Sequence, residues 1–179
     1  MSADVSCRVA WSDDAPAIAA VQVRAWRDSY ADVLPAEVLA GLDPDAIAEG
    51  WRASLARPAD ARQRVLIALE RNLVTGFALT GPSGDPDRDP VADGEITDLT
   101  VDPHQRGAGH GSRLMQACVD TLKADRFARA VTWLGATDDE TRGFLTAAGW
   151  APDGAHRTLD LTGDGSVTVK QVRLHTDLG

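Results

Sequence analysis

The spacing of hydrophobic residues predicts a chain in which short strands alternate with amphipathic helices. Apolar side chains recur at every second residue, or fill short runs rich in β-branched residues, in six stretches bounded by turn-forming residues. These predicted strands are residues 5–11, 64–70, 73–80, 95–101, 155–161 and 167–175. The two-residue step Arg71-Asn72 predicts a hairpin between the second and the third of them.

Five further stretches either repeat apolar residues every three to four positions or begin with residues that commonly start helices. They are residues 12–28, a short segment opened by Pro35, a segment opened by Asp43-Pro44, the segment after the glycines at 107–111, and residues 137–149. Thr137 and Glu140 have the spacing of a capping box. Because strands outnumber helices in an order too mixed for a doubly wound sheet, we expect an α/β or α+β domain with a largely antiparallel sheet.

Residues 81–94 interrupt this pattern of strands and helices. They contain three prolines, three glycines and four aspartates, a composition that disfavours regular structure. We expect a long loop here, and a disordered surface insertion is favoured over a mobile flap that covers a ligand site.

Length and charge limit the classes of protein to be considered. The 179 residues fit one domain, residues 1–179, and 27 acidic against 18 basic residues give a net charge of −9. This charge disfavours nucleic acid and anionic membranes as partners and suits cationic molecules better, and an equally favoured interpretation is that the acidity only keeps the protein in solution. No apolar run approaches the roughly 18 residues of a membrane span, and the N-terminus lacks a signal-peptide pattern, so we expect a cytoplasmic protein. Cys7 and Cys118 are expected to remain reduced thiols.

The most specific stretch runs from residue 101 to residue 115 and reads Val-Asp-Pro-His-Gln-Arg-Gly-Ala-Gly-His-Gly-Ser-Arg-Leu-Met. Glycines at 107, 109 and 111 let a ligand approach the backbone closely, and the helix that follows offers unpaired N–H groups and the positive end of its dipole. Arg106 adds a permanent charge that can bind a phosphate through two hydrogen bonds. The pattern predicts phosphate binding, although glycines also serve ordinary strand-to-helix turns.

The glycine spacing distinguishes this stretch from two other phosphate loops. The glycines stand at relative positions one, three and five, not at the one, three and six of dinucleotide-binding proteins, and no Gly-Lys-Ser/Thr follows as in a Walker loop. The run Val-Asp-Pro-x-x-Arg-Gly-x-Gly-x-Gly resembles the acetyl-CoA loop of the GNAT acetyltransferase superfamily. Arg106, Gly109 and Gly111 match the core pattern of that loop.

Three other parts of the chain are similar to the same superfamily. Residues 23–35 resemble the first helices of many members, Val131–Ala136 stands where members have a strand, and Phe144–Trp150 is similar to their Phe-Tyr-x-x-x-Gly-Phe ending. The resemblance implies an α/β (α+β) GNAT fold, with a mixed, mostly antiparallel central sheet flanked by helices. In that fold the fourth and fifth strands splay apart to hold acetyl-CoA, the co-substrate.

The resemblance also assigns residues to acetyl-CoA. The main chain of Leu99, Thr100 and Val101 is expected to hold the pantetheine arm, and that stretch is expected to polarise the thioester carbonyl through a backbone N–H freed by a bulge. The pyrophosphate is expected to lie against Arg106 and the backbone of Gly107, Ala108, Gly109, His110, Gly111 and Ser112. For His110 we expect the main-chain N–H to matter more than the ring.

Acetyl transfer to an amine requires a proton acceptor, because a free amine with a pKa near 10.4 is protonated at neutral pH. The resemblance favours Glu95 as general base, or as the residue that orients a water for this role. Asp98 is the next carboxylate along, and a solvated strand end is an equally weighted interpretation of Glu95. On a regular strand the two side chains face opposite sides, so at most one faces the cleft unless a bulge intervenes.

The chain departs from the superfamily where many members have a tyrosine as general acid. Alignment on Gly149-Trp150 places Leu145 there, which has no proton to donate. Tyr30, the only tyrosine, is a candidate acceptor-site residue or relocated acid, although packing between helices is favoured. A CoA thiol with a pKa near that of cysteine, about 8.5, can leave without such an acid.

We therefore expect an acetyl-CoA-dependent N-acetyltransferase that moves the acetyl group directly to a primary amine of a small molecule or peptide. The alternative is a catalytically weak acyl-CoA-binding regulatory module. No metal is expected, because the histidines at 104, 110, 156 and 175 lack the spacing of metal ligands. The five tryptophans are expected in the core. Asp138 is expected to start a helix. The resemblance leaves open a homodimer formed through the C-terminal strands.

Overall fold

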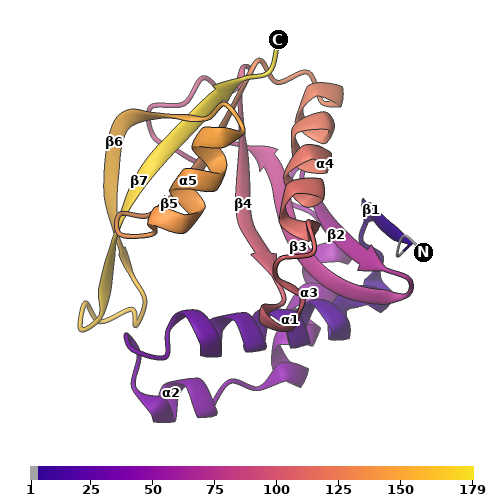
Figure 1. Ribbon diagram of the computed structural model, residues 1–179, viewed down its shortest axis with the longest axis vertical. Helices are drawn as coiled ribbons and strands as arrows, with labels where there is room; N and C mark the ends of the chain where they lie inside the picture. The colour runs from indigo at the N-terminus through magenta and orange to yellow at the C-terminus, as the bar shows by residue number, and fades with distance from the viewer. Residues whose placement is uncertain (1–3) are drawn as a thin grey trace.

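A computed structural model describes residues 4–179, which form a seven-stranded sheet with helices on both faces (Figure 1). The strands are β1 (Val5–Val9), β2 (Arg64–Glu70), β3 (Leu73–Pro82), β4 (Asp93–Val101), β5 (Arg129–Gly135), β6 (Ala151–Asp160) and β7 (Thr168–Asp177). The helices are α1 (Ala15–Ser29), α2 (Ala36–Ala40), α3 (Pro44–Ala56), α4 (His110–Ala124) and α5 (Asp139–Ala147), with short 3-10 turns η1 (Ser12–Asp14) and η2 (Pro103–Gln105). Every predicted strand and helix is present, with its ends shifted by a few residues.

The strand order in the sheet is β1-β2-β3-β4-β5-β7-β6. All neighbouring strands are antiparallel except β4 and β5, which are parallel. The predicted hairpin joins β2 and β3, and Arg71 in its turn has a φ of 56°. The expectation of a mixed, mostly antiparallel sheet is therefore confirmed.

The two faces of the sheet carry separate hydrophobic clusters, because side chains along a strand alternate between faces. On one face, β-strand residues such as Ile96 and Leu174 pack with the apolar side of α4 and with Leu145 of α5. On the other face, Phe77 and neighbouring strand residues pack against α1 and α3. The apolar residues predicted for α4 belong to the first cluster, with Leu114, Met115, Cys118 and Leu122 buried and Val119 half-buried against it.

The segment between β3 and β4 differs from the prediction of a disordered insertion over residues 81–94. The flanking strands extend to Pro82 and begin again at Asp93, so the connection is residues 83–92. Ser83 and Asp85 are buried, and backbone bonds such as Ser83 N–H to Asp93 O (2.9 Å) close the connection into a compact loop. Composition suggested disorder because it gave no sign of the partners that hold this loop on the folded sheet.

Two local predictions were wrong in detail. The N-cap of α5 is Asp138, whose carboxylate accepts from Thr141 N–H at 3.0 Å, and not Thr137 in a capping box. Of the tryptophans, Trp150 alone is buried, whereas Trp11 is 64% exposed and lies beneath the Arg8 guanidinium, 3.8 Å from its ring centroid. Both cysteines are free thiols, as expected.

Gly76 sets the close approach of β3 to β4 and supports a stability prediction. A Cβ at this position would lie 2.7 Å from the Thr100 carbonyl oxygen, which is backbone and has no room to move within the sheet. We expect Gly76→Ala to lower the free energy of unfolding by about 1–3 kcal/mol in chemical denaturation. Gly50→Ala is the control, because Gly50 is exposed in α3 with open space around it, and there we expect a gain of about 0.5–1 kcal/mol. Equal stability of the Gly76→Ala variant and the wild type would contradict this close packing.

Candidate functional site

The site is organised by the separation of β4 from β5. The two strands pair only over Asp93–Glu95 and Arg129–Val131, and the next hydrogen bond between them is the Thr132 hydroxyl donating to Ile96 O at 2.8 Å. Beyond this point β4 pairs with β3 alone, and Figure 1 shows β4 and β5 diverging. The backbone edge of Leu99, Thr100 and Val101 that faces β5 is therefore not used by the sheet.

A β-bulge interrupts β4 where this separation begins. Leu79 lies opposite Thr97 and Phe77 lies opposite Thr100, so β4 has one residue more than β3 over this interval. The extra residue is in the pair Asp98-Leu99, and Asp98 has a φ of 52°, a left-handed conformation that is unusual for a residue other than glycine. The bulge confirms the local irregularity that the resemblance implied.

The glycine-rich stretch forms the turn into α4. Gly107 and Gly109 have φ values of 78° and 80°, which glycine adopts without strain, and Gly109 is the N-cap of α4. The first backbone bond of the helix is Arg113 N–H to Gly109 O at 3.2 Å. The N–H groups of the first turn, including those of His110, Gly111 and Ser112, therefore have no partner within the helix and lie at the positive end of its dipole.

Side-chain contacts of Asp102, Arg113 and Arg106 fix this turn. Asp102, at the end of β4, accepts two bonds from Arg24 of α1, at 2.5 and 3.1 Å, and also caps η2 through His104 N–H. Arg113 donates to Ala108 O at 3.2 Å, and Arg106 forms an exposed ion pair with Asp28 at 2.8 Å. The turn is thus tied to α1 and to its own helix. Asp102, Arg24 and Arg113 were not identified from the sequence.

The ring of His110 has a structural partner of its own. It is 2% exposed beneath the turn, and its Nε2 lies 3.1 Å from Glu70 Oε2 at the end of β2. Its main-chain N–H belongs to the first turn of α4, as predicted, while the ring packs the helix start against the sheet.

These residues fit the pyrophosphate of acetyl-CoA. Gly107 and Gly109, with positive φ, have no Cβ to hold a ligand away from the backbone, free N–H groups of the first helical turn provide donors, and Arg106 and Arg113 provide positive charge nearby. The unpaired edge of β4 begins directly upstream, as an extended pantetheine arm requires.

Glu95 lies at the closed end of the separated strands, on the opposite face from Ile96. It is 9% exposed, and its carboxylate accepts from Gly84 N–H at 3.0 Å. Burial raises the pKa of the Glu95 carboxyl above its ordinary value, and the charge of Asp85 adds to this rise, while the Gly84 bond and Arg157 oppose it. The structure therefore does not place Glu95 at a solvated strand end.

Asp98 and Tyr30 lie on the side of the sheet where α1 ends. Burial and then the charge of Asp98 raise the pKa of the Tyr30 hydroxyl. Tyr30 is half-buried and makes an edge contact with Trp26, with 5.5 Å between the ring centroids. A protonated phenol near the bulge is compatible both with packing and with a proton-donating role.

Leu145 is 2% exposed and belongs to the hydrophobic cluster beneath α4 and α5. The position where many members carry a tyrosine is therefore filled by core packing. Asp138 caps α5, which confirms its expected role as a helix-start residue.

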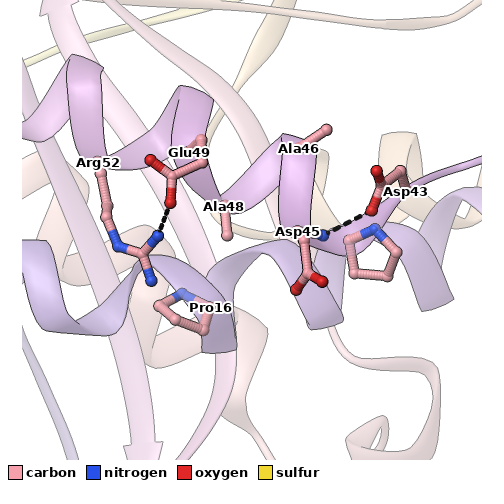
Figure 2. Close-up of a pocket in the computed structure, with 8 residues that line it drawn as sticks. Pro16, Asp43, Asp45, Ala46, Ala48, Glu49 and Arg52 are labelled. Atoms are coloured by element: carbon pink, nitrogen blue, oxygen red, sulfur yellow. Dashed lines mark hydrogen bonds and ion pairs between the residues drawn. The ribbon is translucent and has the colours of Figure 1, made fainter.

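Two hollows lie on the helical surfaces. A groove of ≈ 380 Å³ runs between α4 and α5, and its lining includes Ser112, Met115, Lys123, Phe144 and Trp150. A second hollow of ≈ 330 Å³ lies between α1 and α3 (Figure 2), where Glu49 pairs with Arg52 and Asp43 caps α3 through Asp45 N–H. None of the predicted acetyl-CoA or base residues lines this second hollow, so the site is not there.

Within residues 4–179 there is no group of three or more side chains suited to bind a metal ion. Among the same residues, no helix is both long and apolar enough to span a bilayer.

A sheet that opens between its two parallel strands, directly before a glycine-rich helix start, defines an acyl-CoA-binding class of transferase. The family model described as Acetyltransferase (GNAT) family matches residues 23–150. The chain therefore belongs to the GNAT acetyltransferase family, and it is an acyltransferase with acetyl-CoA as its co-substrate. The predicted GNAT fold is confirmed.

Solved structures show the same fold at low sequence identity. PaiA N-acetyltransferase from Thermoplasma acidophilum, in complex with coenzyme A, has a TM-score of 0.74 and 14% identity over 99% of each chain. An N-acetyltransferase from Staphylococcus aureus Mu50 has a TM-score of 0.72 and 18% identity over 98% of this chain and 99% of that one. Ribosomal-protein-alanine N-acetyltransferase from Brucella melitensis has a TM-score of 0.72 and 17% identity, covering 96% and 99%. A comparison with curated protein sequences gave no match.

Gly111 provides a test of the phosphate turn that leaves the fold in place. A Cβ there would meet only Val101 Cγ2, at 3.6 Å, and an aspartate in the first turn of a helix interacts favourably with the dipole. We expect Gly111→Asp to remain folded and to weaken acetyl-CoA binding by at least about 10-fold in calorimetry, because its carboxylate repels the pyrophosphate. Gly50→Asp adds the same charge on exposed α3 and should bind normally. Unchanged affinity of Gly111→Asp would contradict the assignment of residues 106–112.

Proposed function

We propose that the protein transfers the acetyl group of acetyl-CoA directly to a primary amine of a small molecule or a peptide. The observation that carries this proposal is the carboxylate of Glu95, which is buried beside the opening between β4 and β5 and has a raised pKa. A carboxylate in this state is a better proton acceptor than one in water. Membership of the GNAT family identifies acetyl-CoA as the acyl donor. Glu95 is the proton acceptor that transfer to an amine also requires.

Each part of the site has a distinct proposed task. Arg106 and the backbone of residues 107–112 bind the pyrophosphate, and Leu99, Thr100 and Val101 bind the pantetheine arm through their free backbone edge. When bound, acetyl-CoA supplies an acyl group activated as a thioester. The bulge at Asp98-Leu99 releases backbone groups from the β3 ladder, so that an N–H can be aimed at the acyl carbonyl oxygen.

Glu95 then removes the proton that the amine must lose, directly or through a water molecule. Deprotonating a lysine-like amine at neutral pH costs roughly 4–5 kcal/mol, so a nearby base contributes substantially to the rate. Tyr30 and Asp98, near the end of α1, are proposed to contact the acceptor. The net charge of −9 favours an acceptor that is cationic before it reacts.

Leu145 favours a second candidate function, a catalytically weak acyl-CoA-binding regulatory module. Its burial removes a proton donor from the position where many members have one. The two functions differ in turnover: an enzyme releases CoA thiol in proportion to added amine, whereas a binding module retains affinity for acetyl-CoA without amine-dependent release. One domain over residues 1–179, a cytoplasmic location and a homodimer remain predictions from the sequence.

The assignment of Glu95 as base is tested by Glu95→Gln. We expect kcat with an active amine to fall about 100-fold or more, because general-base catalysis typically contributes that much, while acetyl-CoA binding stays unchanged. Wild-type activity should decrease as the pH falls through the pKa of Glu95, and this limb should lie above the range of an ordinary glutamate because the pKa is raised. Asp98→Asn serves as the comparison, and it should keep the acidic limb. A Glu95→Gln enzyme with wild-type kcat would remove Glu95 from the mechanism.

A further inference from the structure

The loop of residues 83–92 is fastened to the sheet by a buried arginine. The side chain of Arg173, on β7, is 7% exposed and donates to three carboxylates. It reaches Asp85 at 2.9 Å, Asp87 at 2.7 and 2.8 Å, and Asp153 at 2.7 Å. Charge-assisted bonds of this kind, with a planar guanidinium at their centre, have a fixed geometry. The loop therefore has a defined position over β5 and β7.

Asp85, one of the two loop carboxylates bonded to Arg173, also accepts a hydrogen bond from a residue of β5. Its side chain is 6% exposed, and its two oxygens accept from the indole N–H of Trp133 at 3.1 and 3.2 Å. Trp133 is the register partner of Arg173 in the adjacent strand, so one carboxylate joins neighbouring strands at the same level. Asp87, in contrast, is 64% exposed and meets Arg173 alone.

The residue directly before Asp85 contacts the proposed base. Gly84 N–H donates to Glu95 Oε2 at 3.0 Å. Gly84 lies between Ser83, whose N–H donates to Asp93 O at 2.9 Å, and Asp85, whose side chain is held by Trp133 and Arg173. The bonds of Asp85 therefore fix one side of the peptide that carries the Gly84 N–H. The chain of contacts therefore runs from β7 and β5, through Asp85, to the carboxylate on β4.

We propose that Asp85 is a positioning residue for Glu95. By anchoring the loop to Trp133 and Arg173, it holds the Gly84 N–H against the Glu95 carboxylate and keeps that carboxylate in one orientation, shielded from bulk water. The inference rests on the proposed function, in which Glu95 is the base. It assigns to the loop a task in the reaction that its composition did not indicate.

The charges around Glu95 agree with this arrangement. On the loop are Asp85, Asp87, Arg88 and Asp89, and on the strands beneath it are Asp93, Arg129, Asp153, Arg157, Arg173 and His175. Asp93 is paired with Arg129 at 2.9 Å, and Asp153 with Arg173. Asp85 raises the pKa of Glu95, whereas Arg157, which stacks over the Trp133 ring at 4.2 Å, lowers it.

The first test compares Asp85→Ala with Asp87→Ala. Both variants remove one carboxylate from Arg173 and leave it two, so both should fold. We expect Asp85→Ala to lower kcat about 10- to 100-fold, the usual effect of a misplaced catalytic group, with KM for acetyl-CoA changed less than about threefold. Asp87→Ala, which has no contact with Glu95 or Trp133, should retain kcat within about threefold. Equal kcat values for the two variants would overturn the proposal.

A double-mutant cycle separates positioning from a general structural effect. If Asp85 acts through Glu95, Asp85→Ala should cause no further loss of kcat in the Glu95→Gln enzyme. Additive losses in the double variant would mean that Asp85 acts independently of the base, and the inference would be wrong while Glu95 kept its role. A wild-type kcat for Glu95→Gln would instead contradict the proposed function.

The contact itself can be followed without turnover. The amide resonance of Gly84 should titrate with the ionisation of Glu95 in ¹H–¹⁵N NMR spectra of the full chain. It should do so in the wild type and in Asp87→Ala, and it should lose this titration in Asp85→Ala. A Gly84 amide that still titrates in Asp85→Ala would show that the loop keeps its position without Asp85.

Discussion

The end of the backbone ladder between β4 and β5 at Glu95 is the constraint on which the site depends. Up to that residue the strands pair in parallel, and beyond it each keeps only its antiparallel neighbour, β3 or β7. An open edge of backbone inside a sheet is costly unless a ligand uses it. The strands on either side of this opening are packed into the hydrophobic clusters of the two faces, and we propose that acetyl-CoA binds at the opening.

The end of β4 sets the position of the glycine turn and of the first turn of α4. Asp102 closes the strand, pairs with Arg24 of α1 and caps η2, so the glycine turn starts from a fixed point. The buried His110 ring, bonded to Glu70, then seats the first turn of α4 on the sheet. If this turn binds the pyrophosphate as proposed, its anchoring at both ends reduces the conformational entropy lost on binding. The same helix buries its apolar side in the larger hydrophobic cluster, so binding and stability share one element.

The surroundings of the proposed base, Glu95, differ from those of the glycine turn. Here the sheet is covered by ion pairs and a compact loop, in which Arg173 donates to three carboxylates and offsets part of their mutual repulsion. A buried charge without a partner is strongly destabilising, and the buried carboxylates of Asp85 and Asp93 and the half-buried one of Asp153 each have a partner in Arg173 or Arg129. One result is a carboxylate, Glu95, in a partly dehydrated setting with a fixed hydrogen-bond donor.

Local signals in the sequence determined the strands and helices, the glycine-rich turn before α4 and the family, because periodicity, caps and glycine spacing act over a few residues. Tertiary structure alone decided the order of the loop over residues 83–92. Its main bond, between Asp85 and Arg173, joins residues 88 positions apart, and composition carries no record of such a partner. The same holds for the burial of Glu95 and for the exposure of Trp11. The environment of a charged or aromatic side chain depends on which distant segments pack against it, and that is fixed only when the chain folds.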